Sequence, residues 1–144
     1  MNDPLLGESP TSGLIYRYRP AQDPLGPAVI LLHGLHGDER AMWVLEHALP
    51  PTGARIAPRG IFPLQAGGFG WVSPEVQGRP HRKDFQPALD ALKLLIADLT
   101  LRGELDPGQV VLMGFSQGAA CGFAHAMLGE RPPVSYTHLT LPTN

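Results

Sequence analysis

The sequence predicts an α/β fold built on a mostly parallel sheet. Short apolar runs rich in β-branched residues alternate with longer segments of helical character along the 144 residues. Short apolar runs are typical of strands buried on both faces, and strands that alternate with helices pair in parallel through right-handed crossovers. A third observation is the pentapeptide GFSQG at 114–118, which lies between such a strand and such a helix.

The composition is that of a globular domain with its own core. Hydrophobic residues make up 43% of the chain, charged residues 17%, and the net charge is −2. So small a net charge gives no indication of a nucleic-acid or anionic-membrane surface. The start of the chain has no basic, apolar leader, and no stretch approaches the about 20 apolar residues of a membrane span, so we expect a cytoplasmic protein.

Cysteine and metal-ligand patterns exclude two kinds of site. The one cysteine, Cys121, excludes an internal disulfide framework, and its place in an apolar helix predicts a small core residue. No cluster of histidine, cysteine and carboxylate residues has the spacing of metal ligands. We therefore expect no metal site.

The first half of the chain contains three expected strands and one helix. Residues 1–12 show no pattern and are expected to form a mobile leader. Strands are expected at 13–19, where aromatic residues alternate in part, at 28–32 (AVILL) and at 54–57. A helix is expected at 39–48, ended by a double proline.

The segment HGLHGDE at 33–39 links the second expected strand to this helix. It contains a glycine pair and, at Asp38, an acidic N-cap residue. Such a loop presents free backbone N–H groups that bind an anion or a developing oxyanion. An ordinary strand-to-helix turn contains the same residues, so the loop alone leaves both interpretations open. Together with the pentapeptide downstream, it favours an oxyanion loop.

The long irregular segment 61–82 holds the motif GGFGW at 67–71. Loops of this length inside a compact domain are often functional. Phe69 and Trp71 either line an apolar substrate groove or cover the core, and the sequence does not separate these alternatives.

The segment 84–102 shows the clearest helical periodicity. Its apolar residues recur at spacings of four, three, four and three, which places them on one face: Phe85, Leu89, Leu92, Ile96 and Leu99. The charged residues between them are expected to lie in solvent: Asp90, Lys93 and Asp98.

The pentapeptide GFSQG comes after an expected strand at 110–113 and precedes a small, apolar helix at 119–128. Strand, tight turn and helix form the context of a nucleophile elbow, G-x-S-x-G. Such a turn predicts a strained backbone at Ser116 and a steric need for Gly114 and Gly118. A glycine-rich turn with an incidental serine is the alternative, and the flanking strand and helix favour the catalytic interpretation.

Four motifs together resemble the phospholipase/carboxylesterase family, the acyl-protein-thioesterase-like members of the α/β-hydrolase superfamily. They are LHGLHGDE at 32–39, APRG at 57–60, GGFGW at 67–71 and GFSQGA at 114–119. The resemblance covers about residues 14–131, and bacterial esterases are most similar. It implies an α/β-hydrolase sandwich, hydrolysis of carboxylic esters or thioesters through an acyl-enzyme, a Ser-Asp-His triad and no cofactor.

The resemblance also implies roles for individual residues. Ser116 would be the nucleophile, and the backbone N–H groups of Leu35 and Gln117 would form the oxyanion hole. The expected partner is a small-molecule or acyl ester or thioester substrate, without nucleic acid or a membrane span, and the oligomeric state is not indicated. Two other classes stay open: a non-catalytic binding module on the same fold, and a dienelactone-hydrolase-like enzyme.

The chain departs from the family after the nucleophile. In this family the acid and the base come after the serine along the chain. The helix at 119–128 takes up much of the segment beyond Ser116, which leaves no room for the later strands and loops. We therefore expect residues 1–133 to be a partial domain without its second half, without the triad Asp and His, inactive alone, and with the outer edge of the 110–113 strand unpaired.

The segment from 134 onward resembles the in-frame translation of a transposon-end sequencing adapter. We predict that 134–144 is a non-native tail, which excludes His138 as the base. His125 lies on the helix after Ser116 and is carried away from its hydroxyl, whereas His33 belongs to the oxyanion loop as an orienting group. The other histidines show no triad pattern: His36, His47 and His81.

Overall fold

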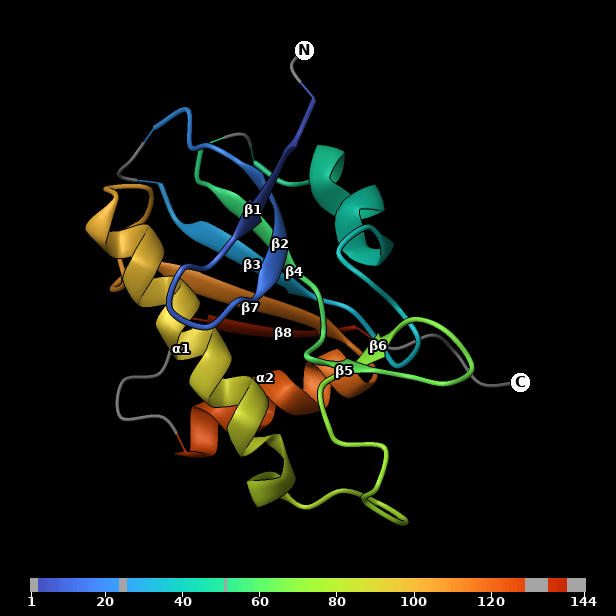
Figure 1. The fold of residues 1–144 in the computed structure, drawn as a ribbon. Helices are drawn as coiled ribbons and strands as arrows, with labels where there is room; N and C mark the ends of the chain where they lie inside the picture. The colour runs from blue at the N-terminus through green and yellow to red at the C-terminus, as the bar shows by residue number, and fades with distance from the viewer. Residues whose placement is uncertain (1–2, 24–25, 51, 129–134, 140–144) are drawn as a thin grey trace.

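The chain forms a six-stranded sheet with helices on its faces (Figure 1). The computed structural model describes residues 3–23, 26–50, 52–128 and 135–139. In spatial order the strands are β1 (Leu5–Glu8), β2 (Ile15–Arg19), β4 (Arg55–Pro58), β3 (Ala28–Leu32), β7 (Val110–Phe115) and β8 (Ser135–Leu139). β1, β2 and β4 pair antiparallel, while β4, β3, β7 and β8 pair in parallel, which confirms the predicted fold class.

The centre of the sheet positions the two loops of interest. β3 occupies the predicted residues 28–32, and its register with β7 pairs Leu32 with Gly114. Because the carboxyl ends of parallel strands meet at one edge of a sheet, the loop after β3 and the pentapeptide after β7 begin side by side.

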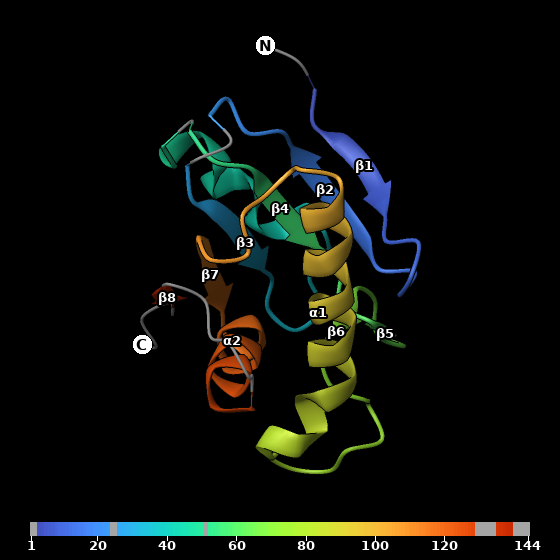
Figure 2. The same cartoon turned by 90° about the vertical axis from the view of Figure 1, so that its left-hand side faces the viewer.

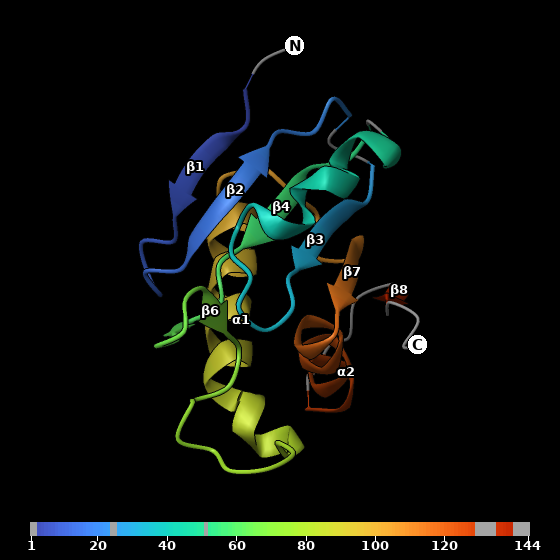
Figure 3. The same cartoon turned by 90° about the vertical axis from the view of Figure 1, so that its right-hand side faces the viewer.

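Two helices cover one face of this sheet and a 3₁₀ helix covers the other (Figures 2 and 3). α1 (Gln86–Leu101), which continues the 3₁₀ turn η2 (Arg82–Phe85), and α2 (Gln117–Leu128) share the larger core with the sheet. On the opposite face η1 (Ala41–Ala48) packs Met42 against β3 and β4. The predicted helix at 39–48 is thus a 3₁₀ helix, because Trp43 and Val44 have weak helix propensity and the double proline prevents elongation.

The apolar face of α1 lies close to the prediction. Phe85, Leu89, Leu92 and Leu99 are buried, whereas Ile96 is half-buried and Leu95 is the fully buried residue of that turn. Asp90 and Lys93 are exposed as predicted.

The N-terminal residues are an ordered part of the sheet, so the prediction of a mobile leader was wrong. β1 pairs with β2, and the hydroxyls of Ser9 and Thr11 donate to the Asp98 carboxylate, the second at 2.9 Å. Asp98 is therefore buried rather than solvated, and the Ser9 hydroxyl in particular lowers the pKa of its carboxyl group. Leu5 and Leu6 are both exposed, so β1 lacks the alternation of buried and exposed residues by which a strand is predicted from sequence.

β8 is a second difference from the prediction. Its five residues pair in parallel with β7, from Val111 opposite Ser135 to Phe115 opposite Leu139, so the edge expected to be unpaired is covered. The sequence SYTHL contains β-branched and aromatic residues that favour a strand whatever their origin. The non-native origin of 134–144 stays a prediction, and residues 134 and 140–144 lie outside the described residues.

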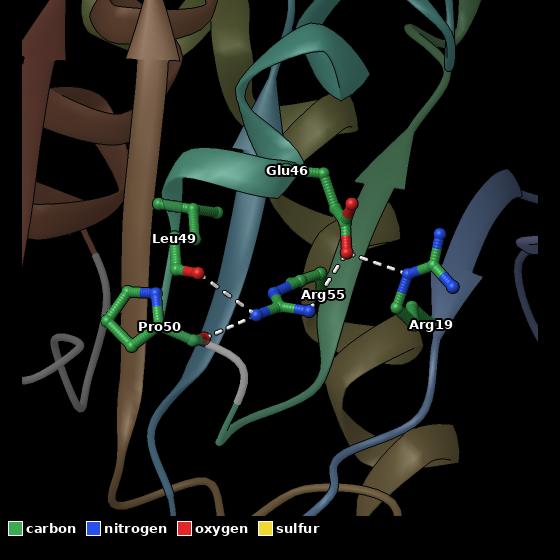
Figure 4. A network of polar contacts seen from close by, with 5 residues as sticks. All are labelled: Arg19, Glu46, Leu49, Pro50 and Arg55. Atoms are coloured by element: carbon green, nitrogen blue, oxygen red, sulfur yellow. Dashed lines mark hydrogen bonds and ion pairs between the residues drawn. The ribbon is translucent and has the colours of Figure 1, made fainter. Parts of the chain in front are cut away.

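A cluster of charges fixes η1 to the sheet (Figure 4). The carboxylate of Glu46 lies 2.7 Å from Arg19 Nε on β2 and 2.9 Å from Arg55 Nη1 on β4. Arg55 also donates to the carbonyl oxygens of Leu49 (3.2 Å) and Pro50. Because Arg55 is buried, these bonds replace the water that its Nη1 and Nη2 groups lose, and they hold the end of η1 over β4.

The packing of α2 predicts an unreactive thiol at Cys121. The side chain is fully buried, and burial raises its pKa to about 12. We expect native protein at pH 8 to react with a disulfide reagent at least about a thousandfold slower than unfolded protein, because the thiolate is the reactive form. The release of thionitrobenzoate with and without guanidinium measures this ratio.

The control for this prediction is Ala120→Cys in a Cys121→Ser background, which presents a thiol at an exposed position of the same helix. If native Cys121 reacts as fast as this control, the predicted packing of α2 against the sheet does not form.

Candidate active site at the carboxyl edge of the sheet

Ser116 is the only residue between β7 and α2, and its backbone is strained. Its φ is +54°, in the left-handed region that residues other than glycine rarely adopt, and its side chain is exposed. This confirms the strained conformation predicted from the pentapeptide. A turn of this kind holds the hydroxyl clear of both the strand and the helix.

We call residues 114–118 the elbow. Its two glycines, Gly114 and Gly118, exclude a side chain for different steric reasons. A Cβ on Gly114 would lie 2.6 Å from the backbone of Gly118, as expected for a turn this tight. A Cβ on Gly118 would lie 2.1 Å from the carbonyl oxygen of Leu32 and 2.4 Å from that of His33. The contacts of Gly118 show that the backbone of the elbow lies directly against the backbone at the end of β3.

The loop at 33–39 is bonded to the short hairpin of β5 (Phe62–Pro63) and β6 (Phe69–Gly70). His36 N–H donates to Phe69 O at 3.0 Å, and Phe69 N–H donates to Gly37 O at 2.9 Å. His36 also has a positive φ, +70°, and its Nδ1 lies 2.9 Å from Gly67 O. The hairpin therefore fixes this loop from its outer side.

The side chains of Leu35 and Gln117 both lie close to Gly70. A Cβ on Gly70 would be 3.3 Å from Leu35 Cδ1 and 3.2 Å from Gln117 Oε1. Gln117 is the first residue of α2, where backbone N–H groups have no acceptor within the helix. Among the residues that the structure describes, Leu35 N–H also has no hydrogen-bond acceptor, although the next two N–H groups do. Two free donors thus lie in neighbouring loops at the same edge.

Trp71 belongs to the core, which is the second of the two alternatives open from the sequence. Its side chain has no exposed surface, and its indole Nε1–H donates to His33 O at 2.8 Å. Its backbone N–H donates to Gln117 Oε1 at 2.7 Å. Trp71 is therefore not the surface of a groove, whereas Phe69 is half-buried beneath the Arg59 guanidinium, 4.7 Å from the ring centroid.

His33 is a neutral, fully bonded histidine. Gly60 N–H can only donate, so His33 Nε2 accepts at 2.8 Å, and the ring proton lies on Nδ1, which donates to Gly34 O at 2.6 Å. Burial lowers the pKa of the imidazole. With both nitrogens engaged, His33 holds the loop in place and has no free nitrogen for a general base, in agreement with the expected orienting role.

An ion pair connects the loop to the end of β4. Arg59 donates from Nε and Nη2 to the two carboxylate oxygens of Glu39, each at 2.8 Å. These hydrogen bonds lower the pKa of Glu39 to about 2 against the opposing effect of burial. No pattern in the sequence indicates this pair, because the two residues belong to separate motifs and no periodicity relates them.

The chain also matches a known family in sequence. The model of the phospholipase/carboxylesterase family matches residues 18–135. The chain belongs to this family. No curated protein matches the chain.

Solved structures of similar fold include a carboxylesterase from Mesorhizobium loti, with 22% identity and a TM-score of 0.80. The aligned region covers 99% of this chain and 67% of the carboxylesterase chain. Esterase PE8 has 25% identity, a TM-score of 0.65 and coverage of 83% and 60%. The carboxylesterase from Bacillus cereus has 19% identity, a TM-score of 0.70 and coverage of 88% and 58%. The chain thus has the α/β-hydrolase fold and spans 58–67% of the length of these three proteins.

Two histidines lie downstream of the elbow in the described part of this family member. His125 is half-buried nine residues beyond Ser116 on α2, about 13 Å along the helix axis, and burial lowers its pKa. His138 pairs with Gly114 through the backbone of β8. Within the described ranges no three His, Cys, Asp or Glu residues are grouped to hold a metal, and no helix has the length and apolarity of a membrane span.

The glycines of α2 give a matched pair of substitutions. We expect Gly118→Ala to cost more than about 3 kcal/mol, because its Cβ overlaps two carbonyl oxygens of rigid backbone. Gly122→Ala adds the same methyl group 3.9 Å from Leu32 Cδ1, an ordinary contact, and should stabilise the helix by about 0.5–1 kcal/mol. Urea unfolding measures both, and equal stabilities would contradict the tight contact at Gly118.

The pair of Glu39 and Arg59 predicts a pH dependence of stability. Because folding lowers the pKa of Glu39 from 4.5 to about 2, its contribution is complete above pH 4.5 and is lost as the pH falls toward 2. We expect Glu39→Gln to cost about 1–2 kcal/mol at pH 7 and progressively less below pH 4.5, since Arg59 is 31% exposed.

Urea unfolding of wild type and Glu39→Gln between pH 7 and pH 2.5 checks this, with the exposed Glu75→Gln as control. If the difference in the free energy of unfolding between wild type and Glu39→Gln is the same at pH 7 and pH 2.5, the ion pair does not form.

Proposed function

We propose that this chain carries the nucleophile and oxyanion hole of a serine hydrolase that cleaves carboxylic esters or thioesters through an acyl-enzyme. The observation that supports this most is the strained, exposed Ser116 between β7 and α2, at the sheet edge where Leu35 and Gln117 present free N–H groups. Membership of the phospholipase/carboxylesterase family agrees with this chemistry.

In the proposed reaction Ser116 Oγ attacks the acyl carbonyl as a base takes its proton. The negative charge moves to the carbonyl oxygen, which the N–H groups of Leu35 and Gln117 stabilise; loss of one such donor typically costs about 10²–10³ in rate. The base then gives this proton to the leaving oxygen or sulfur as the tetrahedral intermediate expels the alcohol or thiol. Water, which loses a proton to the same base, releases the acyl group from the serine, and the serine oxygen regains its proton. Half-buried Phe69, on the hairpin beside the loop, is proposed to contact the acyl group.

We further propose that these residues do not include the base. Both ring nitrogens of His33 are bonded, and His125 lies far along α2. In the G-x-S-x-G hydrolases the acid and base come after the serine, in the part of the fold that this chain, at 58–67% of the length of similar proteins, does not span. The proposal includes a non-native origin of residues 134–144.

The first prediction from this proposal concerns the chain itself. Residues 1–144 should hydrolyse p-nitrophenyl acetate no faster than their Ser116→Ala variant, because an unactivated serine is a weak nucleophile. Initial rates of the two proteins at equal concentration test this. Turnover that depends on Ser116 would place the base within these residues and overturn the proposed incompleteness.

The second prediction concerns a chain in which the genomic coding sequence continues past the codon for Pro133. We expect it to add an Asp and a His on later loops, and the product to react with a fluorophosphonate probe at Ser116 but not as Ser116→Ala. Absence of labelling would favour a binding module. A panel of esters, thioesters and lactones separates an esterase from a dienelactone-hydrolase-like enzyme.

A further inference from the structure

We propose that the Gln117 side chain and Trp71 position the two oxyanion donors relative to each other. This inference rests on the proposed function, since it assigns a role to the supports of Leu35 and Gln117. We call the two hydrogen bonds of Trp71 the Trp71 clamp: Trp71 N–H to Gln117 Oε1 at 2.7 Å, and Trp71 Nε1–H to His33 O at 2.8 Å.

The sheet alone does not position the two donors. The ladder between β3 and β7 ends at the pair of Leu32 and Gly114, and each donor lies three residues beyond that pair. Strand pairing therefore fixes where the two segments leave the sheet, but it does not fix the positions of the Leu35 and Gln117 N–H groups. An oxyanion hole needs both donors within about 2.7–3.1 Å of one oxygen, so the loops need a common support.

Gln117 supports the elbow side. Because Trp71 N–H can only donate, the oxygen of the Gln117 carboxamide is the acceptor, and the side chain points toward the hairpin that carries Trp71. Gln117 thus acts twice: its backbone N–H is the proposed oxyanion donor, and its side chain fixes the direction of the residue that carries this donor. Any substitution except proline keeps the N–H group, so the two roles can be separated.

Trp71 supports the loop side. Its indole is fully buried, packs 5.0 Å from the His33 ring and donates to the His33 carbonyl, two residues before Leu35. The His33 ring is itself bonded to Gly34 and Gly60, so the indole holds a segment that is already rigid. One residue of the core therefore contacts both segments that carry the donors.

Gly70 allows the hairpin backbone to approach the side chains of Leu35 and Gln117. Any side chain there would press on Gln117 Oε1 and Leu35 Cδ1, at 3.2 Å and 3.3 Å from its Cβ. The backbone of the hairpin at Gly70 thus lies close to the side chains of both donor residues, and a side chain there would force them to shift. This contact explains why the clamp reaches both of them from a single position.

The test uses phenylboronic acid and amide NMR on the 144-residue chain. Boron accepts an electron pair from Ser116 Oγ, the Oγ–B bond forms, the hydroxyl proton passes to the buffer, and the anionic tetrahedral adduct places an oxygen where the oxyanion would lie. In wild type the probe should shift the amide signals of Leu35 and Gln117, and Ser116→Ala should remove both shifts. The Trp71 amide should exchange slowly with deuterium.

Gln117→Met keeps the length and the backbone N–H but removes the carboxamide. We expect it to speed deuterium exchange at Trp71 about tenfold or more, to weaken boronate binding about five- to tenfold, and to reduce the shift at Leu35, a residue that the substitution does not touch. Trp71→Phe should act in the same direction. Gln117→Glu, which keeps an acceptor oxygen, should restore the protection of the Trp71 amide, and Gln109→Met at an exposed position should change nothing.

The results separate this proposal from the proposed function. Boronate binding and a Leu35 shift in Gln117→Met equal to those of wild type would overturn the positioning role alone. A wild-type chain that binds the boronate at Ser116 and has a protected Trp71 amide, but whose Leu35 and Gln117 signals do not respond, would overturn the oxyanion assignment on which both rest. A wild-type Trp71 amide that exchanges within seconds would show that the clamp itself is absent.

Discussion

The structure depends on the direct backbone contact between the elbow and the end of β3. The Cα of Gly118 faces the carbonyl oxygens of Leu32 and His33 so closely that no side chain fits between them. This approach requires that β3 and β7 be neighbours, that they pair in parallel, and that the register place Leu32 beside Gly114. Without it, the serine, the loop at 33–39 and the hairpin would each have an ordinary local structure and no common site.

Around this contact the protein uses polar groups where apolar packing cannot hold a loop. On the loop at 33–39, His33 is bonded through both ring nitrogens and Glu39 is paired with Arg59 at the end of β4, while Glu46 contacts two arginines from the end of η1. Each pair joins segments that the sheet leaves independent. Buried polar groups need such partners, so the loops become as rigid as the strands to which they are attached.

Local patterns in the sequence were sufficient for the centre of the fold and for the elbow. The apolar run of β3, the periodicity of α1 and the pentapeptide each depend on near neighbours in the chain, and each has the predicted structure. β1 was missed because its exposed residues show no alternation, and its pairing with the next strand, β2, is made by the backbone. β8 was missed because its segment was interpreted as part of a non-native tail. Asp98 was misjudged for a related reason, since its partners Ser9 and Thr11 belong to a segment without any pattern. Trp71 stayed ambiguous because aromatic residues suit both a groove and a core.

The pairing of β3 with β7 has a consequence for how the protein reaches its native state. The two strands are separated by the whole segment 33–109, so their association closes a long loop before any contact of the site can form. Non-local parallel pairing is slow compared with the formation of helices and hairpins. The local elements α1 and the β5–β6 hairpin are therefore available early, and the strained turn at Ser116 is imposed late, when β3 is already in place to hold it. A nascent chain would acquire the strained backbone at Ser116 only at the end of folding.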